Sequence, residues 1–405
     1  MVYKPTRGSA PLRLGETIVG LPGVAGSTLN ADLYRDPKRF EAERTQVLRS
    51  SWMIAARSSE LPSYGDWVVY EGHGETVIVC RQDDGSVAGF HNVCQHRGAR
   101  LSRAEESGCD RRFTCPWHGW VYDTTGDLVG VPERDDFDPA HLDGLRSPKV
   151  AADEWGGWVW INMVGDDAPS LMDWIGADIT TDLGQFAMDD MVLHDKLVYD
   201  LPVNYKAIVD GFNEVYHVTE LHHVDPEFTK SARDAAFHLS GPNSMMFVPR
   251  HQHREALAET GDHHQFSICH YVVFPNAIFN NNPDQIQVFQ PIPLTADTTR
   301  FICWELIYGP NGDDDTEYES YLAGAIERWA HLKEVVEEDL FVFGEVGAAS
   351  QSMGYTQNIF STRECKLTRY HEVMDHCVGG GSALDFYDDT ETKPETKSET
   401  MKDSP

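Results

Sequence analysis

Two short cysteine–histidine pairs constrain this chain more than any other feature. Cys94 and His96 form the first pair with one residue between them, and Cys115 and His118 form the second with two residues between them. Two thiolates with two imidazoles bind zinc, or an iron–sulfur cluster in which His replaces Cys on one of two irons. The sequence therefore predicts a metal site held between two loops.

The residues around the pairs favour one of these alternatives. Each pair mixes Cys with His, whereas common zinc fingers place two Cys in one loop and two His in the other. The segments C-Q-H-R-G and C-P-W-H-G-W resemble the Rieske loops of ring-hydroxylating oxygenases. The resemblance implies a [2Fe-2S] cluster with Cys94 and Cys115 on one iron and His96 and His118 on the other. Zinc is the alternative, and a colourless zinc-loaded protein would support it.

Composition excludes several kinds of partner. The chain has 405 residues and a formal net charge of −32, whereas nucleic-acid binding needs a basic surface. The same charge argues against docking on anionic membranes, and no apolar run is long enough to predict a transmembrane helix. The eight cysteines lack the dense, even spacing of a secreted disulfide scaffold. We therefore expect a cytoplasmic protein that binds neither nucleic acid nor a membrane.

The distribution of apolar runs predicts an α+β chain. Short runs rich in β-branched and aromatic residues predict an all-β domain over residues 46–162, with the metal loops between its strands. Residues 1–45 are expected to form an N-terminal helical segment that packs on the catalytic domain. Residues 163–381 mix both element types, and the acidic residues 382–405 are predicted to be disordered. The main predicted elements are helices at Ala31–Arg49, Tyr205–Tyr216 and Glu317–Val346, and strands at Phe266–Phe279, Gln285–Pro291 and Thr299–Tyr308.

A second candidate metal site follows in the mixed region. His217 and His222 are five residues apart, a spacing that places them on different faces of an unbroken helix. If the helix ends near His217 and the chain turns, both imidazoles can converge on one ion. Two His and one carboxylate form the facial triad of non-heme Fe(II) sites, which leaves positions open for O₂ and substrate. The neighbouring His223 is a competitor for the second position.

The stretch from Asn204 to His222 resembles the mononuclear-iron motif of the same oxygenase family. The resemblance implies that a downstream helix supplies the third ligand, and Asp339 in V-E-E-D-L is the matching residue, with Glu337 and Glu338 as competitors. Glu214 would bond the iron-binding His of its own subunit and a cluster-binding His of the neighbouring subunit. Asp210, one turn earlier, either lines the iron pocket and accepts a proton or has a structural role.

Together the two motifs imply an α subunit of a Rieske non-heme iron oxygenase, with an N-terminal Rieske domain and a catalytic domain whose antiparallel sheet is flanked by helices. The implied cofactors are one [2Fe-2S] cluster and one Fe(II) per chain, with O₂ as co-substrate and NAD(P)H acting through a separate reductase. The implied partners are a ferredoxin or a flavin reductase, and the implied assembly is a homotrimer or an α₃β₃ complex with a small subunit.

The substrate is the least constrained part of the prediction. An apolar, aromatic small molecule that is mono- or cis-dihydroxylated is the first hypothesis, and oxidative N- or O-demethylation is the alternative. The residues expected to line the pocket are apolar and comprise Val209, Phe212, Val218 and Phe279. A Rieske electron-transfer protein is the non-enzyme alternative, but the disulfide of the respiratory type cannot form because Ala99 and Trp117 occupy its positions. Four other histidines are expected in a polar loop: His251, His253, His263 and His264.

Overall fold

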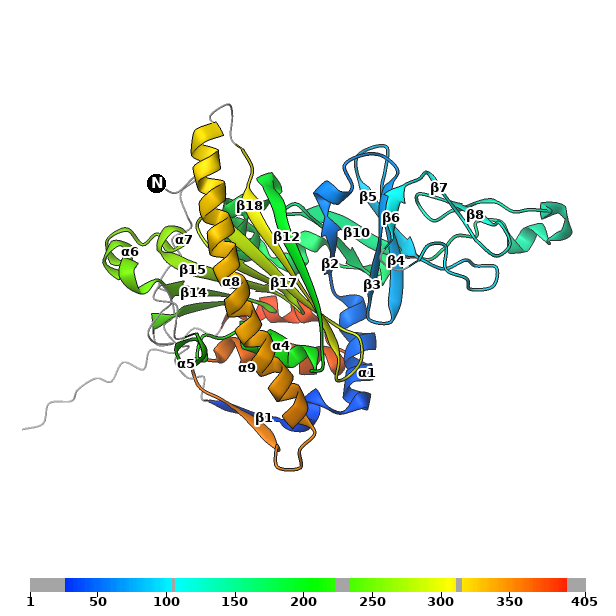
Figure 1. Cartoon of the computed structure of the whole chain (residues 1–405). Helices are drawn as coiled ribbons and strands as arrows, with labels where there is room; N and C mark the ends of the chain where they lie inside the picture. The colour runs from blue at the N-terminus through cyan, green and yellow to red at the C-terminus, as the bar shows by residue number, and fades with distance from the viewer. Residues whose placement is uncertain (1–25, 104–105, 223–233, 311–314, 392–405) are drawn as a thin grey trace, which may run out of the picture.

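The computed structural model describes residues 26–103, 106–222, 234–310 and 315–391. Its N-terminal part is built of strands, and its C-terminal part combines a large antiparallel sheet with helices (Figure 1). This arrangement confirms the predicted α+β class and the predicted order of the two parts. The first 25 residues lie outside the described part of the chain. Residues 392–405, which make up most of the predicted tail, lie outside it as well.

The N-terminal part contains a seven-stranded sheet and a smaller three-stranded one. The larger sheet has the order β2-β11-β10-β5-β4-β3-β6, and the smaller has the order β7-β8-β9. The smaller sheet lies at the end of the molecule farthest from the large C-terminal sheet (Figure 1). The strands are β2 (Met53–Arg57), β3 (Asp66–Gly72), β4 (Glu75–Arg81), β5 (Val87–His91), β6 (Ser107–Cys109), β7 (Arg112–Thr114), β8 (Val121–Asp123), β9 (Leu128–Gly130), β10 (Lys149–Trp155) and β11 (Trp158–Asn162).

The C-terminal part is organised around a second seven-stranded sheet of order β12-β18-β17-β16-β15-β14-β13. Every neighbouring pair in it is antiparallel. A separate two-stranded sheet pairs β1 with β19. The strands are β12 (Met191–Leu201), β13 (Ala236–Ser240), β14 (Asn243–Pro249), β15 (Ser267–Val273), β16 (Ala277–Asn281), β17 (Gln285–Pro293), β18 (Thr299–Tyr308), β1 (Ser27–Asn30) and β19 (Gln357–Phe360).

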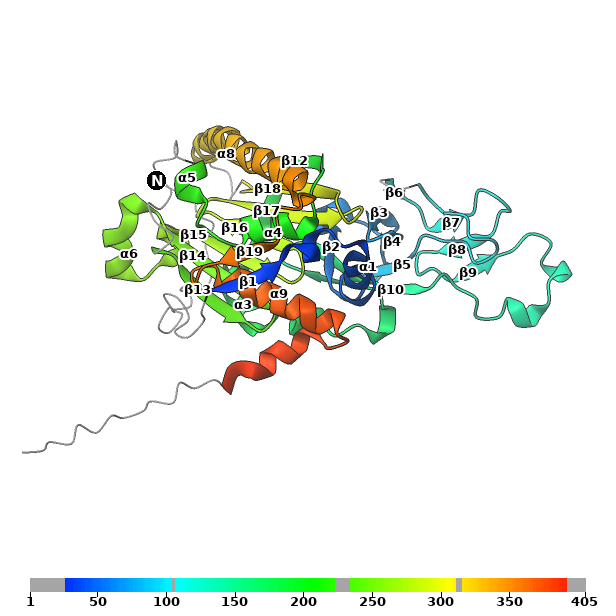
Figure 2. The same ribbon diagram turned by 90° about the horizontal axis from the view of Figure 1, so that it is seen from below.

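Helices cover both faces of the C-terminal sheet, with α8 on one side and α9 on the other (Figure 2). None of the helices in the described part of the chain has the length and apolar character needed to cross a membrane. The helices are α1 (Pro37–Gln46), α2 (Leu171–Ile175), α3 (Ala177–Leu183), α4 (Tyr205–Phe212), α5 (Val218–Leu221), α6 (Arg254–Thr260), α7 (His263–Phe266), α8 (Asp315–Ser350) and α9 (Cys365–Val378), with 3₁₀ turns that include η1 (Ala31–Tyr34) and η11 (Ala383–Glu391).

One continuous core joins the two parts. Side chains of β2 and β11 belong to the same buried cluster as one face of the C-terminal sheet. Trp158 packs edge-on against Trp304 with ring centroids 5.2 Å apart, and both rings are almost fully buried. The opposite face of the sheet forms a second cluster with α4 and α8, which includes Phe212, Phe289 and Trp329. The candidate iron site lies on this second face.

Four predictions of local structure need correction. The strand predicted over Phe266–Phe279 is two strands, because the chain turns back at residues 274–276, which include Pro275, and β15 pairs with β16 in an antiparallel hairpin. The helix predicted to reach Tyr216 ends at Phe212, where Asn213 caps α4. The predicted disordered tail contains η11, whose Ala383 is buried. His264 is buried against Asp182 rather than exposed in a polar loop, with 3.1 Å between Nε2 and Oδ1.

Candidate metal centres

The two metal-binding loops of the N-terminal part share one backbone design. The first loop connects β5 to β6, and the second connects β7 to β8. In each, a glycine amide donates to the cysteine carbonyl: Gly98 to Cys94 at 2.9 Å and Gly119 to Cys115 at 3.1 Å. Both glycines have positive φ, 76° and 72°, a region that other residues enter at a cost. These tight turns bring each cysteine close to the histidine that follows it.

The four predicted cluster ligands lie together at the end of the two loops. Cys94 and Cys115 are buried, at 1% and 3% exposure, and the rings of His96 and His118 have centroids 4.5 Å apart. Burial is the main cause that raises the pKa of Cys94, so a thiolate there needs a cation beside it. Nδ1 of His96 is buried without a hydrogen-bond partner among the described residues. These features fit a [2Fe-2S] cluster.

Tyr122 is positioned to tune such a cluster. Its hydroxyl donates to Sγ of Cys94 at 3.4 Å and accepts from the amide of Gln95 at 2.9 Å. Hydrogen bonds to cluster sulfurs stabilise the more negative reduced state and raise the reduction potential. We expect Tyr122→Phe to lower the potential by about 40 mV, which equals about 1 kcal/mol for a one-electron couple. Spectroelectrochemical titration of the cluster measures this shift, and an unchanged potential would contradict it.

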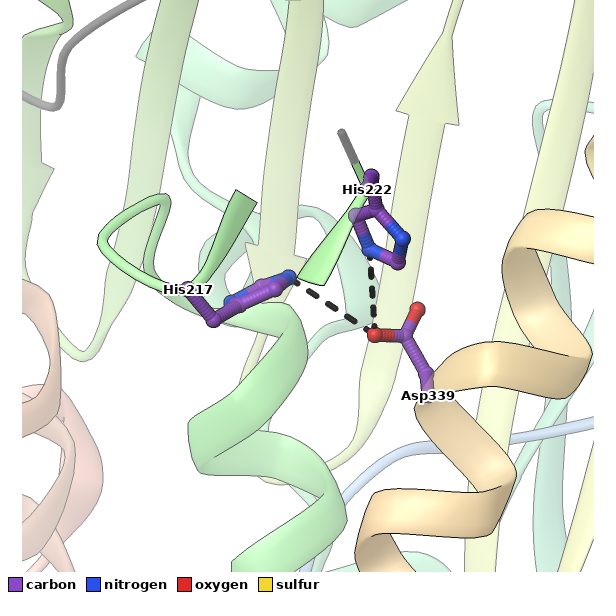
Figure 3. A group of neighbouring side chains, drawn as sticks. All are labelled: His217, His222 and Asp339. Atoms are coloured by element: carbon purple, nitrogen blue, oxygen red, sulfur yellow. Dashed lines mark ion pairs between the residues drawn. The ribbon is translucent and has the colours of Figure 1, made fainter. Parts of the chain in front are cut away.

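The predicted facial triad is assembled by α5 and α8. After α4 ends, the chain turns, and His217 and His222 stand at the two ends of the single-turn helix α5. Asp339 projects from α8 between them (Figure 3). The short helix explains how a five-residue spacing converges, because α5 is separate from α4 and no long helix has to contain both imidazoles. His223, the competing ligand, lies outside the described residues.

The geometry of the three side chains is that of an open metal site. Oδ1 of Asp339 lies 3.2 Å from Nε2 of His222 and 3.7 Å from Nε2 of His217 (Figure 3). One ligand atom from each residue lies within 4.8 Å of the others. His222 and Asp339 are buried, whereas His217 is partly exposed. Two imidazoles with one carboxylate fit a non-heme Fe(II) and leave ligand positions free.

Two further carboxylates orient the imidazoles. Oε1 of Glu214 lies 2.5 Å from Nδ1 of His217, and Oε2 of Glu338 lies 2.7 Å from Nδ1 of His222. Both Nε2 atoms are thereby turned toward Asp339. Burial disfavours the charged form of both imidazoles and so lowers their pKa values. The hydrogen bond to Glu214 and the nearby carboxylate charges together outweigh burial and raise the pKa of His217, and Asp339 and Glu338 do the same for His222. This excess of negative charge also suits a bound cation.

Glu338 was predicted only as a competing ligand, and its hydrogen bond to His222 points to an orienting role instead. We expect Glu338→Ala to weaken Fe(II) binding by about 10- to 100-fold, the usual cost of losing such a partner. The matched control is Glu337→Ala, because Glu337 is the preceding residue of α8 and is exposed. Competition with a fluorescent chelator measures the affinity. Equal affinities in the two variants would rule out the role assigned to Glu338.

Asp210 lies away from the triad. Its carboxylate accepts a hydrogen bond from the Tyr34 hydroxyl and lies 2.9 Å from Nε2 of His371. It lines a neighbouring cavity of about 210 Å³, which it shares with Glu214. Of its two predicted roles, the structure favours the structural one, because α4 turns this carboxylate toward η1 and α9.

A mostly apolar cavity opens beside the triad, with a volume of about 80 Å³. Phe212 and Val218 line it, as predicted from the sequence. Val209 and Phe279 do not line it, contrary to prediction, because both are fully buried in the main core. Alternation along β16 explains the second case: Phe279 faces that core, and its neighbour faces the cavity. The other apolar lining residues are Val215, Met246, Val248, Ile268, Phe289, Leu332, Val335 and Val336.

Two family models match the chain in the order of its two parts. One is described as the Rieske [2Fe-2S] domain and matches residues 51–147. The other is described as the ring hydroxylating alpha subunit catalytic domain and matches residues 188–380. The first range contains the four cluster candidates, and the second contains the triad. This chain belongs to the Rieske non-heme iron oxygenases, as an α subunit. Membership implies that this chain carries a Rieske cluster and a mononuclear iron.

Curated relatives of this chain include enzymes with different substrates. The carnitine monooxygenase oxygenase subunit of Escherichia coli K12 is 32% identical over 212 residues, which cover 51% of this chain and 54% of that protein. The biphenyl 2,3-dioxygenase α subunit of Rhodococcus jostii RHA1 is 29% identical over 211 residues, which cover 48% of this chain and 43% of that protein. The matched regions thus span about half the length of these relatives.

The fold of this chain matches solved structures over most of its length. A quaternary ammonium Rieske monooxygenase superposes with a TM-score of 0.72 at 22% identity, and the match covers 91% of this chain and 99% of that one. At this identity the likeness establishes the fold alone. A naphthalene 1,2-dioxygenase also superposes, with a TM-score of 0.69 at 19% identity over 88% of this chain and 93% of that one, so the same fold occurs in proteins whose names indicate quite different substrates.

Sequence reasoning missed three polar residues of the cavity beside the triad. His270, Asn280 and Gln287 line it from neighbouring strands of the sheet. The available signal was the presence of amides and an imidazole inside runs that otherwise read as buried strands, since buried polar groups need partners. That signal does not say which face of a strand each residue occupies, which only the register decides.

Proposed function

We propose that this chain is the terminal oxygenase component of a multicomponent system that hydroxylates a small, mainly apolar and aromatic molecule. Electrons come from NAD(P)H through a flavin reductase or a ferredoxin. The observation that carries the proposal is the convergence of His217, His222 and Asp339 on one wall of an apolar cavity. A site that only transfers electrons has no use for an apolar cavity beside an open metal triad.

Each set of residues has a distinct role in this proposal. Cys94, His96, Cys115 and His118 hold the cluster, and the triad holds the iron. When bound, the cluster supplies electrons and the iron activates O₂ beside the substrate. Glu214 and Glu338 keep both Nε2 atoms turned toward the iron position. Apolar side chains such as Phe212 and Phe289 hold the substrate and limit water around the reacting position.

Oxidative N-demethylation is the second candidate, and the named activities of relatives favour it. The Escherichia coli relative is a carnitine monooxygenase subunit, and another relative, from Chromohalobacter salexigens, is a glycine betaine monooxygenase subunit. The cavity favours the first candidate, because its described lining offers carboxylates only from Glu214 and Asp339, which are engaged at the triad. A quaternary ammonium cation would lack its own counter-charge there.

Product analysis under ¹⁸O₂ tests both candidates. The iron-loaded protein is reduced through a surrogate ferredoxin and reductase with toluene, phenol, indole, glycine betaine or L-carnitine. We expect ¹⁸O-labelled hydroxylated products from the aromatic compounds and no formaldehyde from the quaternary amines. Formaldehyde as the main product would favour demethylation. No product with any compound, despite three irons per chain and a reducible cluster, would contradict the proposed function.

We also propose that the two metal centres work between neighbouring copies of the chain in a homotrimer. Within one chain the cluster loops and α5 lie at opposite ends of the molecule (Figure 1). Apolar side chains close in sequence to the triad or to its neighbouring cavity are strongly exposed: Tyr216 at 67%, Phe341 at 70% and Ile359 at 72%. On the cluster loops Trp117 is 53% exposed. These surfaces would meet if each cluster docked beside the Glu214 of the next copy.

Phe341→Asp tests this assembly. A charge in a buried contact is costly, so we expect the variant to sediment as a monomer and to lose product formation. Its iron content and cluster absorbance are expected to stay normal, because Phe341 points away from the core. Met172→Asp, an exposed apolar residue of α2, is the control and is expected to keep the wild-type mass. Analytical ultracentrifugation measures the mass of the assembly. An unchanged mass for Phe341→Asp would contradict the proposed contact of Phe341 with a neighbouring copy of the chain.

A further inference from the structure

A row of polar side chains crosses the sheet beneath the cavity. The strand register pairs His270 with Asn280, Asn280 with Gln287, and Gln287 with Glu305. Directly opposed residues of neighbouring strands point to the same face, so the row runs from β15 to β18 on one face. His270, Asn280 and Gln287 line the cavity, and Glu305 is fully buried behind them. The row is the polar part of an otherwise apolar wall.

Arg250 sets the direction of the amides in this row. Its Nη2 donates to Oδ1 of Asn282 at 2.6 Å, and because arginine only donates, Nδ2 of Asn282 faces Gln287. Oε1 of Gln287 accepts from Nδ2 of Asn282 at 3.2 Å and from Nδ2 of Asn280 at 3.0 Å. Nε2 of Gln287 then donates to Oε2 of Glu305 at 2.7 Å. Each amide therefore has one orientation that satisfies its neighbours.

At Asn280, which lines the cavity, the row has an acceptor to which no described residue donates. Nδ2 of Asn280 is used by Gln287, and Oδ1 of Asn280 is buried with no hydrogen-bond partner in the described part of the chain. Nδ1 of the adjacent His270 is also buried and unpartnered among those residues. Burial lowers the pKa of His270 to about 3, so the ring is neutral. Buried polar atoms without partners cost free energy, which a bound donor recovers.

We propose that Asn280 and His270 select substrates that carry an N–H or O–H donor on a small apolar or aromatic body. The donor bonds to Oδ1 of Asn280 beside the His270 ring, and the apolar body contacts side chains such as Phe289 and Val248. Phenols and indoles belong to this class. The inference rests on the proposed oxygenase function and adds the chemical feature that its substrate must have. A quaternary ammonium head has no N–H and leaves the acceptor unsatisfied.

Two pairs of near-isosteric compounds test the proposal on the unmodified protein. Phenol and toluene differ by a hydroxyl against a methyl group, and indole and benzofuran differ by an N–H against a ring oxygen. Binding to the iron-loaded protein is measured by calorimetry without O₂ or reductant, so turnover cannot interfere. We expect phenol and indole to bind about 10- to 100-fold more tightly than their partners, since a site that loses its hydrogen bond discriminates strongly.

Two variants test whether Asn280 is the residue that discriminates between the compounds of each pair. Asn280→Leu keeps the approximate volume and removes the acceptor, so phenol and indole are expected to bind only as well as toluene and benzofuran. Val248→Ala removes apolar contact from the same cavity and is expected to weaken all four compounds by similar factors. Cluster absorbance and iron content confirm that each variant is folded and loaded.

The outcomes separate this inference from the proposed function. Equal affinities within each pair, tighter binding of glycine betaine than of phenol, or no binding of any of the four compounds would overturn the selection by Asn280 and His270. If the pairs bind as expected but reduction under ¹⁸O₂ labels no product, the selection stands and the oxygenase function fails. If toluene and phenol bind equally and both are hydroxylated, the reverse holds.

Discussion

Asp339→Ala is expected to abolish product formation and to lower the iron content from three atoms per chain to two. Asp339 supplies the oxygen atom that both Nε2 atoms of His217 and His222 approach, at 3.7 and 3.2 Å. Without it, two imidazoles and two hydrogen-bonding carboxylates remain, which is one ligand short of the triad. The loss of affinity should exceed the roughly 100-fold that removal of an orienting partner causes.

The brown cluster gives the internal control for this experiment. The cluster loops lie far from α8 (Figure 1), so the visible absorbance of the [2Fe-2S] centre should be unchanged in Asp339→Ala. Glu337→Ala on the same helix should retain three irons and full activity. Iron analysis, absorbance and product formation are measured together on each protein. An active Asp339→Ala variant would show that another carboxylate, with Glu338 the nearest candidate, is the third ligand.

Glu43→Leu is expected to destabilise the protein by about 3–5 kcal/mol, the cost of leaving a buried charge without its partner. Glu43 is fully buried in α1 and accepts hydrogen bonds from Nζ of Lys206 at 2.6 Å and from Tyr205 at 3.1 Å. Lys206 is also fully buried. Burial lowers the pKa of Lys206, and the Glu43 carboxylate opposes that shift. Removing Glu43 therefore leaves the buried ammonium group of Lys206, in α4, without this carboxylate partner.

Two further variants make the stability experiment specific. Glu41→Ala removes an exposed carboxylate of the same helix, which pairs with Arg44, and little change in the denaturation midpoint is expected. The double variant Glu43→Leu with Lys206→Met replaces both charges by apolar groups and should recover most of the loss. Denaturant midpoints followed by fluorescence measure all three. A Glu43→Leu protein as stable as wild type would refute the coupling of α1 to α4.

Much of the fold was accessible from sequence because its signals are local. The long helix α8 was predicted over Glu317–Val346 and found at Asp315–Ser350, since its apolar residues recur with helical spacing. Strands β17 and β18 were found near their predicted positions for a similar reason. The errors occur where single residues or long-range contacts determine the structure. Pro275 lies in a turn that divides one predicted strand into two. The contacts of η11 order part of a segment whose composition predicts disorder.

The tail shows why composition was misleading there. Tyr387 donates to the carbonyl of Trp174, and its hydroxyl also accepts from Nδ2 of Asn243 at 2.8 Å. These partners lie more than one hundred residues away in sequence. An acidic segment of low hydropathy can be ordered by one aromatic anchor, and no pattern within residues 382–405 reveals where that anchor docks.

The sequence by itself determined the chemistry of the two metal centres. Ligand type and short spacing are properties of neighbouring residues, so Cys94, His96, Cys115 and His118 could be named as one site, and His217 with His222 as half of another. Tertiary structure decided what surrounds them. In the tertiary structure Glu338 lies within hydrogen-bond distance of His222 and can orient it, whereas Asp210 lies outside the cavity beside the triad. The tertiary structure also gathers His270, Asn280 and Gln287 from three strands into one polar row. Strand register and helix docking depend on contacts between distant segments, and local sequence patterns do not contain that information.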